Sequence, residues 1–201
     1  MSWIKIIPFD EATGKLKQLY KRVKGPNNNV DNIMMVHSLR PHSMEGHMHI
    51  YKYVLHHNGN TFPKWYLEAI GVYVSMLNKC PYCVEHHYQG MRRLLNNETK
   101  SVAIRNAFEV QKPGLAFEGK ELALMQYAEQ LTLAPATLLA SDLESLRNAG
   151  ADDGEILEVN QVVAYFCYAN RTVLGLGVTT EGDIIGLSPN ENDDPDNWNH
   201  T

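Results

Sequence analysis

The chain has 201 residues, of which 44% are hydrophobic and 20% are charged. This balance is typical of one globular domain and argues against wholesale disorder. A chain of this length buries roughly 70% of its unfolded surface, so it needs neither disulfide bonds nor a structural metal to fold. The formal net charge is −5, and segment 188–201 supplies four acidic residues and no Lys or Arg. The rest is nearly neutral and has no basic stripe, which argues against a nucleic-acid partner.

Hydropathy argues against a membrane partner and against secretion. The longest uncharged stretches, such as 159–170, are about a dozen residues long, well short of the ~18 to 20 apolar residues that a membrane span requires. The first residues, MSWIKIIPFDEATGK, lack an apolar region followed by a small-residue cleavage site. We therefore expect a cytoplasmic location, where a close pair of cysteines is more often catalytic or metal-binding than structural.

Two amphipathic helices are predicted in the first 60 residues. The first covers 12–23, with Asp10 as N-cap and a Gly-Pro pair at 25–26 as its end. Its apolar face consists of Ala12, Leu16, Leu19 and Val23. The second ends at the Asn-Gly pair 58–59. Its apolar face consists of Met44, Met48, Tyr51 and Leu55.

The next helix is predicted to be buried on all sides. Residues 65–77 carry apolar side chains around the whole helix circumference, and Glu68 is the only charged residue among them.

Two capping boxes predict the later helices. Ser141 with Glu144, and Asp152 with Glu155, have the spacing of an N-cap residue and its N3 partner, while Gly150 stands where a helix C-cap belongs. The last long helix has an apolar face formed by Ile156, Val159, Val163 and Phe166.

The periodicity predicts the fold class. Nearly every segment repeats with a period of 3.6 residues, and apart from a short extended piece at 183–187 no strand alternation is present. The chain is therefore predicted to be an all-α bundle of about seven or eight helices. We expect a single domain over 1–187, followed by an acidic tail at 188–201.

The sequence CPYC carries the chemistry. Pro81 favours the first position of a helix, so Cys80 falls at or beside the N-cap. At a helix N-terminus the free N–H groups and the macrodipole stabilise a thiolate. In a helical segment Cys83 lies on the face of Cys80, and His87 follows four residues later on the same face.

Glu68 is a candidate general base. It precedes Cys80 by twelve residues, and its apolar surroundings are expected to raise its pKa towards a useful range. The alternative is a structural ion pair with Lys64, four residues earlier on the same helix.

Eleven residues separate Glu68 from Cys80, two separate Cys80 from Cys83, and three separate Cys83 from His87. The spacing of these four residues resembles the alkylhydroperoxidase D (AhpD)-like branch of the carboxymuconolactone decarboxylase family. The resemblance extends to the stretches WIKIIPFDEATGKLKQLY, YAEQLTLAP, LRNAGADDGEILEV and ANRTVLGLGV, which look like the peroxidase-related members. Tyr82 departs from the pattern, because AhpD itself commonly has a histidine inside the CxxC. A phenol shuttles protons poorly at neutral pH, so Tyr82 bears on turnover and substrate preference.

The resemblance implies an AhpD-like helical bundle that reduces hydroperoxides without a cofactor or metal. Cys83 is then the peroxidatic residue and Cys80 the resolving residue, with Glu68 and His87 as a proton relay. An external thiol or disulfide reductant protein resets the pair, and a homo-oligomer is expected. The wider family suggests an alternative reaction, decarboxylation of a γ-lactone, which would not require a CxxC.

Other interpretations of the same residues stay open. CPYC also occurs in glutaredoxins, but there it follows a strand of a βαβ pattern. A zinc-stabilised interaction module would use Cys80, Cys83, His86 and His87, although this spacing makes closure of a tetrahedral site awkward. Six histidines crowd into 37–57, and we expect most of them on the wetter side of their helix, with no metal ligand assigned.

Overall fold

The computed structural model describes residues 2–189 and 198–200, and these residues form an all-α bundle. The helices are α1 (Gly14–Val23), α2 (Asn32–Met35), α3 (Pro41–Tyr51), α4 (Lys64–Leu77), α5 (Pro81–Leu95), α6 (Glu98–Glu109), α7 (Gly119–Leu133), α8 (Ala140–Asn148) and α9 (Asp153–Leu176). A π-helix, Lys52–His56, continues α3. Within the described ranges no strand occurs, only an isolated bridge between Pro189 and His200. The predicted fold class is confirmed, with α2 as a single short turn beside eight longer helices.

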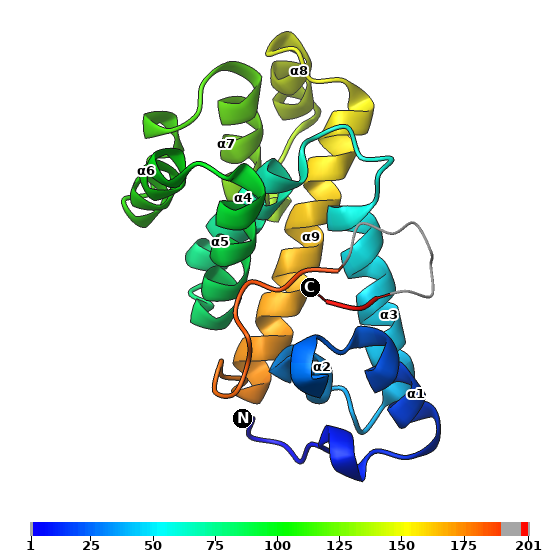
Figure 1. Ribbon diagram of the computed structural model, residues 1–201. Coiled ribbons are helices and arrows are strands. Elements are labelled where there is room, and N and C mark those ends of the chain that lie inside the picture. The colour runs from blue at the N-terminus through cyan, green and yellow to red at the C-terminus, as the bar shows by residue number, and fades with distance from the viewer. Residues whose placement is uncertain (1, 190–197, 201) are drawn as a thin grey trace.

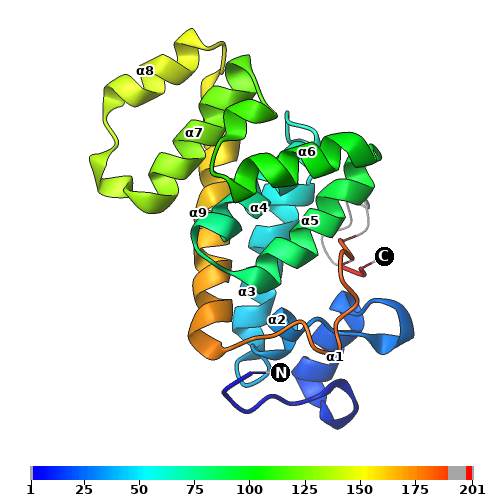
Figure 2. The ribbon, with the colours of Figure 1, turned by 90° about the vertical axis from the view of Figure 1, so that its left-hand side faces the viewer.

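Helix α4 is the centre of the bundle. It packs most extensively against α5 and α9, and also against α7 and α6. Figures 1 and 2 show α6, α7 and α8 at one end of the long helix α9 and α1 and α2 at the other end. The segment after α9 runs back along the bundle towards α5 in both views. It therefore returns to the region where α4, α5 and α9 meet.

The sequence pattern explains the burial of the central helices. Ten consecutive residues of α4, Tyr66–Ser75, are buried, as an apolar helix circumference predicts. The predicted faces of α3 and α9 are also buried: Met44, Met48, Tyr51, Leu55, Ile156, Val159, Val163 and Phe166.

The predicted helix starts are only partly correct. The capping box of Asp152 and Glu155 forms at the start of α9. Asp10, however, is not an N-cap, because a 3-10 turn (Phe9–Glu11) precedes α1 and Thr13 is the N-cap residue. The box predicted from Ser141 is also wrong. Helix α8 starts at Ala140, and the carboxylate of Asp142 accepts the N–H of Leu139 (2.7 Å).

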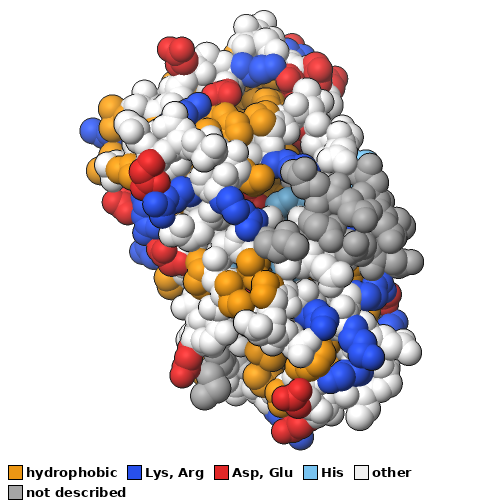
Figure 3. Space-filling view, in the orientation of Figure 1, with side chains coloured by type: hydrophobic (Ala, Val, Ile, Leu, Met, Phe, Trp, Pro, Cys, Tyr) orange, Lys and Arg blue, Asp and Glu red, His pale blue; other side chains and the backbone are white. Residues whose placement is uncertain are grey.

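The outer surface is mixed in character. On the face shown in Figure 3, basic and acidic side chains are interspersed with apolar patches. Among the described residues, no helix has the length and hydropathy needed to cross a lipid bilayer. The predicted boundary at residue 187 stays a prediction, since residues 190–197 and 201 lie outside the described part of the chain.

A glycine permits the closest contact between α4 and α9. A Cβ atom added at Gly71 would lie 2.0 Å from Cζ of Phe166, which is fully buried. We expect Gly71→Ala to lower the free energy of unfolding by about 1–3 kcal/mol, because the Phe166 ring must move within a packed core. Urea unfolding measures the effect. Gly46→Ala, where an added Cβ meets nothing within 4 Å, is the matched control, and an equal loss in both variants would contradict this packing.

Candidate active site

The two cysteines of the CPYC sequence lie at the start of α5. Cys80 is the N-cap residue and Pro81 is the first helical residue, as expected. Both thiols are free and buried, and their Sγ atoms are 3.2 Å apart. The pair is close enough to share one proton and to form a disulfide after a small adjustment of side-chain torsions.

The shared hydrogen bond makes the two thiols unequal. The pKa of Cys80 is lowered by the hydrogen bond with Cys83, against the effect of burial, with help from the backbone N–H of Cys83. The pKa of Cys83 is raised well above its ordinary value by the hydrogen bond with Cys80 and by burial. Of the two thiols, Cys80 is therefore the one whose ionised form is favoured. Cys83 needs a neighbouring base to take its proton.

Glu68 and His87 are joined by a short hydrogen bond between α4 and α5. Nδ1 of His87 donates to Oε2 of Glu68 (2.6 Å), and the Glu68 side chain is only 1% exposed. Because a carboxylate only accepts, this bond places the proton on Nδ1 and leaves Nε2 as the ring atom that can accept another. The two residues thus form the second half of a nucleophile, base and orienting-carboxylate arrangement.

A second histidine holds the other oxygen of Glu68. Nε2 of His56 lies 3.2 Å from Oε1 of Glu68, within ion-pair distance although not aligned as a hydrogen bond. Burial raises the pKa of Glu68, but His87 and His56 together outweigh burial and lower it to about 2. The expectation that burial raises this pKa towards neutrality is wrong, because two imidazoles stabilise the ionised carboxylate.

The alternative pairing of Glu68 with Lys64 is also wrong. The partners of this carboxylate are His87 and His56, whereas Nζ of Lys64 donates to Oδ1 of Asn58 (3.2 Å).

The histidines of segment 37–57 do not follow the expected distribution. His37, His47 and His56 are buried, whereas His42 and His57 are exposed and His49 is partly exposed. The π-helix that continues α3 contains His56. An extra residue in the turn changes the register of the helix, so periodicity extrapolated through 52–56 could not place this side chain against Glu68.

The hydroxyl of Tyr82 is bound by the segment that follows α9. It donates to Oδ2 of Asp183 (2.7 Å) and accepts the backbone N–H of Ile33 (3.2 Å). Burial and Asp183 raise the pKa of Tyr82 well above its ordinary value. Asp183 also accepts the N–H of Asn32 at the start of α2 (3.0 Å). Tyr82 therefore ties the CxxC helix to two distant segments, and its hydroxyl proton is committed to Asp183.

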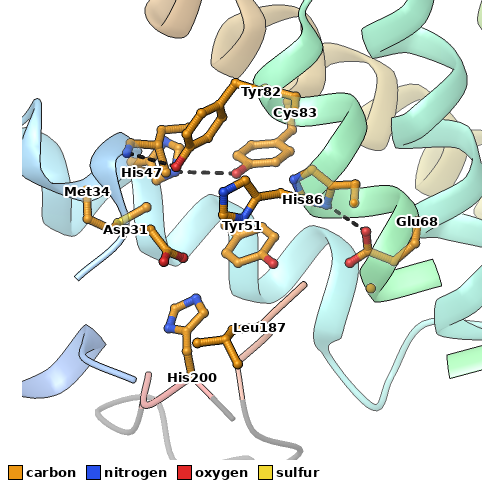
Figure 4. Close-up of a pocket in the computed structure, with 14 residues that line it drawn as sticks. Asp31, Met34, His47, Tyr51, Glu68, Tyr82, Cys83, His86, Leu187 and His200 are labelled. Atoms are coloured by element: carbon orange, nitrogen blue, oxygen red, sulfur yellow. Dashed lines mark hydrogen bonds and ion pairs between the residues drawn. The ribbon is translucent and has the colours of Figure 1, made fainter. Parts of the chain in front are cut away.

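These elements line a narrow cavity of about 30 Å³ that is partly open. Figure 4 shows its walls, which include Cys83, His86, Glu68 and Tyr51. His87 also lines it. The structure thus brings Glu68, Cys83 and His87 to one cavity, with Tyr82 in its wall. Cys80 instead borders a larger cavity of about 440 Å³ on α4, α5 and α6.

The four residues of the zinc interpretation do not converge. Nε2 of His86 lies 3.3 Å from Oδ2 of Asp183, and its ring stacks on Tyr82 (4.5 Å between centroids). His87 points instead to Glu68. Within the described residues, no group of three His, Cys, Asp or Glu side chains is arranged to hold a metal ion.

Sequence reasoning missed Asn170 and Asp183. Asn170 is fully buried on α9, donates to Oγ of Ser75 (3.0 Å), and its side chain lowers the pKa of both cysteines. Its signal was available, because Asn170 continues the apolar stripe of α9 four residues after Phe166. Asp183 gave no comparable signal, since its partners are 101 and 151 positions away in the sequence.

Comparisons with known proteins show the fold. No protein-family description matches this chain, and no curated protein matches it. The crystal structure of an AhpD-core, peroxidase-related protein from Ralstonia eutropha JMP134 superimposes with a TM-score of 0.75 at 18% identity, covering 90% of this chain and 93% of that one. A peroxidase-related protein from Silicibacter sp. TM1040 gives a TM-score of 0.73 at 20% identity, with the same coverage of both chains.

A third solved structure with a similar fold is named as a debrominase and not as a peroxidase-related protein. The debrominase Bmp8, as a cysteine-to-alanine variant in complex with 2,3,4-tribromopyrrole, gives a TM-score of 0.64 at 18% identity and covers 84% of each chain. The present chain therefore has the AhpD-like fold, which uncharacterised peroxidase-related proteins and a debrominase share.

The lowered pKa of Glu68 predicts a specific acid sensitivity. An unfolded Glu has a pKa of about 4.3, so the ionised form stabilises the fold fully above that pH and loses its effect as the pH falls towards about 2. We expect Glu68→Gln to be less stable than wild type near neutral pH by about 1–3 kcal/mol and to lose less stability over this acid range. Urea unfolding at several pH values measures both. Glu11→Gln, at an exposed position, is the control, and parallel pH curves for wild type and Glu68→Gln would contradict the assignment.

Proposed function

We propose that this protein is a thiol-dependent peroxidase that reduces hydroperoxides through Cys83 and Cys80. One observation carries the proposal. Two free thiols lie 3.2 Å apart, and one of them borders the same cavity as a histidine that is bonded to a buried carboxylate. A thiol, a base and an orienting acid are the groups that nucleophilic sulfur chemistry requires.

Cys83 is the nucleophile in this proposal and His87 is its base. Because burial and Cys80 raise the pKa of Cys83, the thiol does not ionise by itself at neutral pH. Nε2 of His87 takes its proton, and Glu68 stabilises the imidazolium that results. The sulfur attacks one peroxide oxygen, the O–O bond breaks, and the leaving alkoxide or hydroxide receives the proton from His87. Cys83 becomes a sulfenic acid.

Cys80 is the resolving residue. Its thiolate attacks the sulfur of the Cys83 sulfenic acid, the S–O bond breaks, the leaving hydroxide takes up the proton that Cys80 released and departs as water, and a disulfide forms. The lowered pKa of Cys80 suits this step, since a thiolate is the attacking species. Exchange with an external thiol or disulfide reductant protein returns both thiols. The larger cavity beside Cys80 lies away from the Cys83 cavity and offers that reductant a separate approach. The homo-oligomer expected from the resemblance is part of the proposal.

The AhpD-like fold alone does not identify the reaction, since a debrominase has the same fold. Lactone decarboxylation is the alternative reaction suggested by the wider family, and it needs neither sulfur atom. The contact between the two sulfur atoms favours the peroxidase, because a resolving thiol serves a purpose only when its partner is oxidised.

Cysteine variants test the proposed reaction. After treatment with hydrogen peroxide, we expect the intact mass of reduced wild type to fall by two hydrogens as the disulfide forms. Cys80→Ser should gain one oxygen as a trapped sulfenic acid, and Cys83→Ser should not consume peroxide. Cys167→Ser is the matched control and should behave as wild type. Peroxide consumption by Cys83→Ser, or lactone turnover that survives loss of both Cys80 and Cys83, would contradict the proposal.

Tyr82→Phe separates a positioning role from proton transfer. Loss of the hydroxyl removes the bonds to Asp183 and Ile33, so we expect stability to fall by about 1–2 kcal/mol. The rate of disulfide formation with hydrogen peroxide should stay within about threefold of wild type, since the Tyr82 proton is not released at neutral pH. Thermal unfolding and stopped-flow kinetics give the two values. A variant of normal stability with a rate lowered by roughly 100-fold would instead identify Tyr82 as a proton donor.

A further inference from the structure

The segment that follows α9 forms one side of the cavity of Cys83. Leu187 and His200 are part of the cavity wall, and Figure 4 shows both on the side opposite Cys83. Cys83 itself is only 2% exposed. A molecule that reacts with this sulfur from the cavity must therefore pass between these walls or displace them.

Leu187 is held between two fixed parts of the bundle. Its Cδ1 atom lies 2.8 Å from the position that a Cβ would occupy on Gly25, after α1. The preceding Gly186 has φ +85° and lies against α5, where an added Cβ would be 2.6 Å from Cβ of Gln89. Nη2 of Arg93 donates to Oγ of Ser188 (2.5 Å). Contacts on three consecutive residues thus fix this wall of the cavity.

The other wall residue is anchored separately. Nδ1 of His200 donates to the backbone oxygen of Val23 (3.0 Å). Trp198, two residues earlier, is fully buried, with the guanidinium of Arg22 3.8 Å from the centroid of its ring and the edge of His49 against it (4.8 Å between centroids). Two anchored pieces of chain, joined by the bridge between Pro189 and His200, therefore line this side of the site.

The volume of the cavity limits what can enter. A space of about 30 Å³ holds roughly two water molecules. Hydrogen peroxide, with only two heavy atoms, is of this size, whereas cumene hydroperoxide, an arylalkyl hydroperoxide, is several times larger than this space.

We propose that Leu187 makes this site selective for hydrogen peroxide over bulky organic hydroperoxides by narrowing the cavity that Cys83 borders. The inference rests on the proposed peroxidase function and names its substrate class. The selected reaction is balanced without another reactant: the thiol of Cys83 and hydrogen peroxide give the sulfenic acid and water. Leu187 acts in this proposal by steric exclusion.

Rates with two peroxides test the selectivity. Reduced wild type, Leu187→Ala and Ile184→Ala are treated with hydrogen peroxide and with cumene hydroperoxide, and disulfide formation is followed by intact mass. We expect wild type to prefer hydrogen peroxide by at least about tenfold, and Leu187→Ala to reduce that ratio by about tenfold. Ile184 is 38% exposed and lies outside the cavity wall, so Ile184→Ala should keep the wild-type ratio. Equal rates in wild type, or an unchanged ratio in Leu187→Ala, would overturn the inference.

A second measurement distinguishes this inference from the peroxidase proposal. In a Cys80→Ser background, alkylation of Cys83 by iodoacetamide and by a bulky aryl maleimide is compared with and without Leu187→Ala. We expect Leu187→Ala to accelerate the maleimide reaction about tenfold relative to iodoacetamide. If this acceleration occurs but no peroxide is reduced, the proposed function is wrong and the steric role of Leu187 is supported. If peroxide is reduced but Leu187→Ala changes neither ratio, the steric role of Leu187 is wrong.

Discussion

The arrangement of this protein depends on one buried anion, the carboxylate of Glu68. An ionised carboxylate in the centre of an apolar helix is strongly unfavourable unless its oxygens have polar partners. Here each oxygen faces one imidazole, His87 from α5 and His56 from the π-helix that continues α3. Gly90 lies next to the same carboxylate, where a Cβ would be 3.7 Å from Oε2. The packing of α4 against its neighbours thus stabilises the Glu68 carboxylate and also forms the apolar core.

The fixed carboxylate determines which group accepts a proton. Because the pKa of Glu68 is low, Glu68 acts in the proposed reaction as the partner that orients His87, and His87 acts as the base for the thiol of Cys83. Cys80 lies at the helix N-terminus and borders a different cavity. The two cysteines therefore have separate environments although their sulfur atoms touch. This separation suits a cycle in which one sulfur meets the oxidant and the other meets the reductant.

The all-α fold, the buried α4 and the start of α5 at Pro81 followed from hydrophobic periodicity and capping rules, which are local properties of the sequence. The spacing of Glu68, Cys83 and His87 also placed these side chains around one space. The pKa of Glu68 was predicted in the wrong direction, because His56 reaches it only through a π-helix that periodicity does not reveal. The cavity wall formed by Leu187 and His200 depends on contacts of these residues with Gly25 and Val23, near the other end of the chain. The spacing of residues along the sequence cannot predict such long-range contacts.

The state of the Glu68 carboxylate tests the central claim most directly. Carbon-13 NMR of protein labelled at the glutamate side-chain carboxyl carbon, with the Glu68 signal assigned through Glu68→Gln, reports its ionisation at each pH. We predict a constant, ionised signal from about pH 4 to pH 8, since the pKa of Glu68 lies near 2. A titration step between about pH 5 and pH 7 would contradict the account, because Glu68 would then be the proton-accepting base and not the fixed partner of His87.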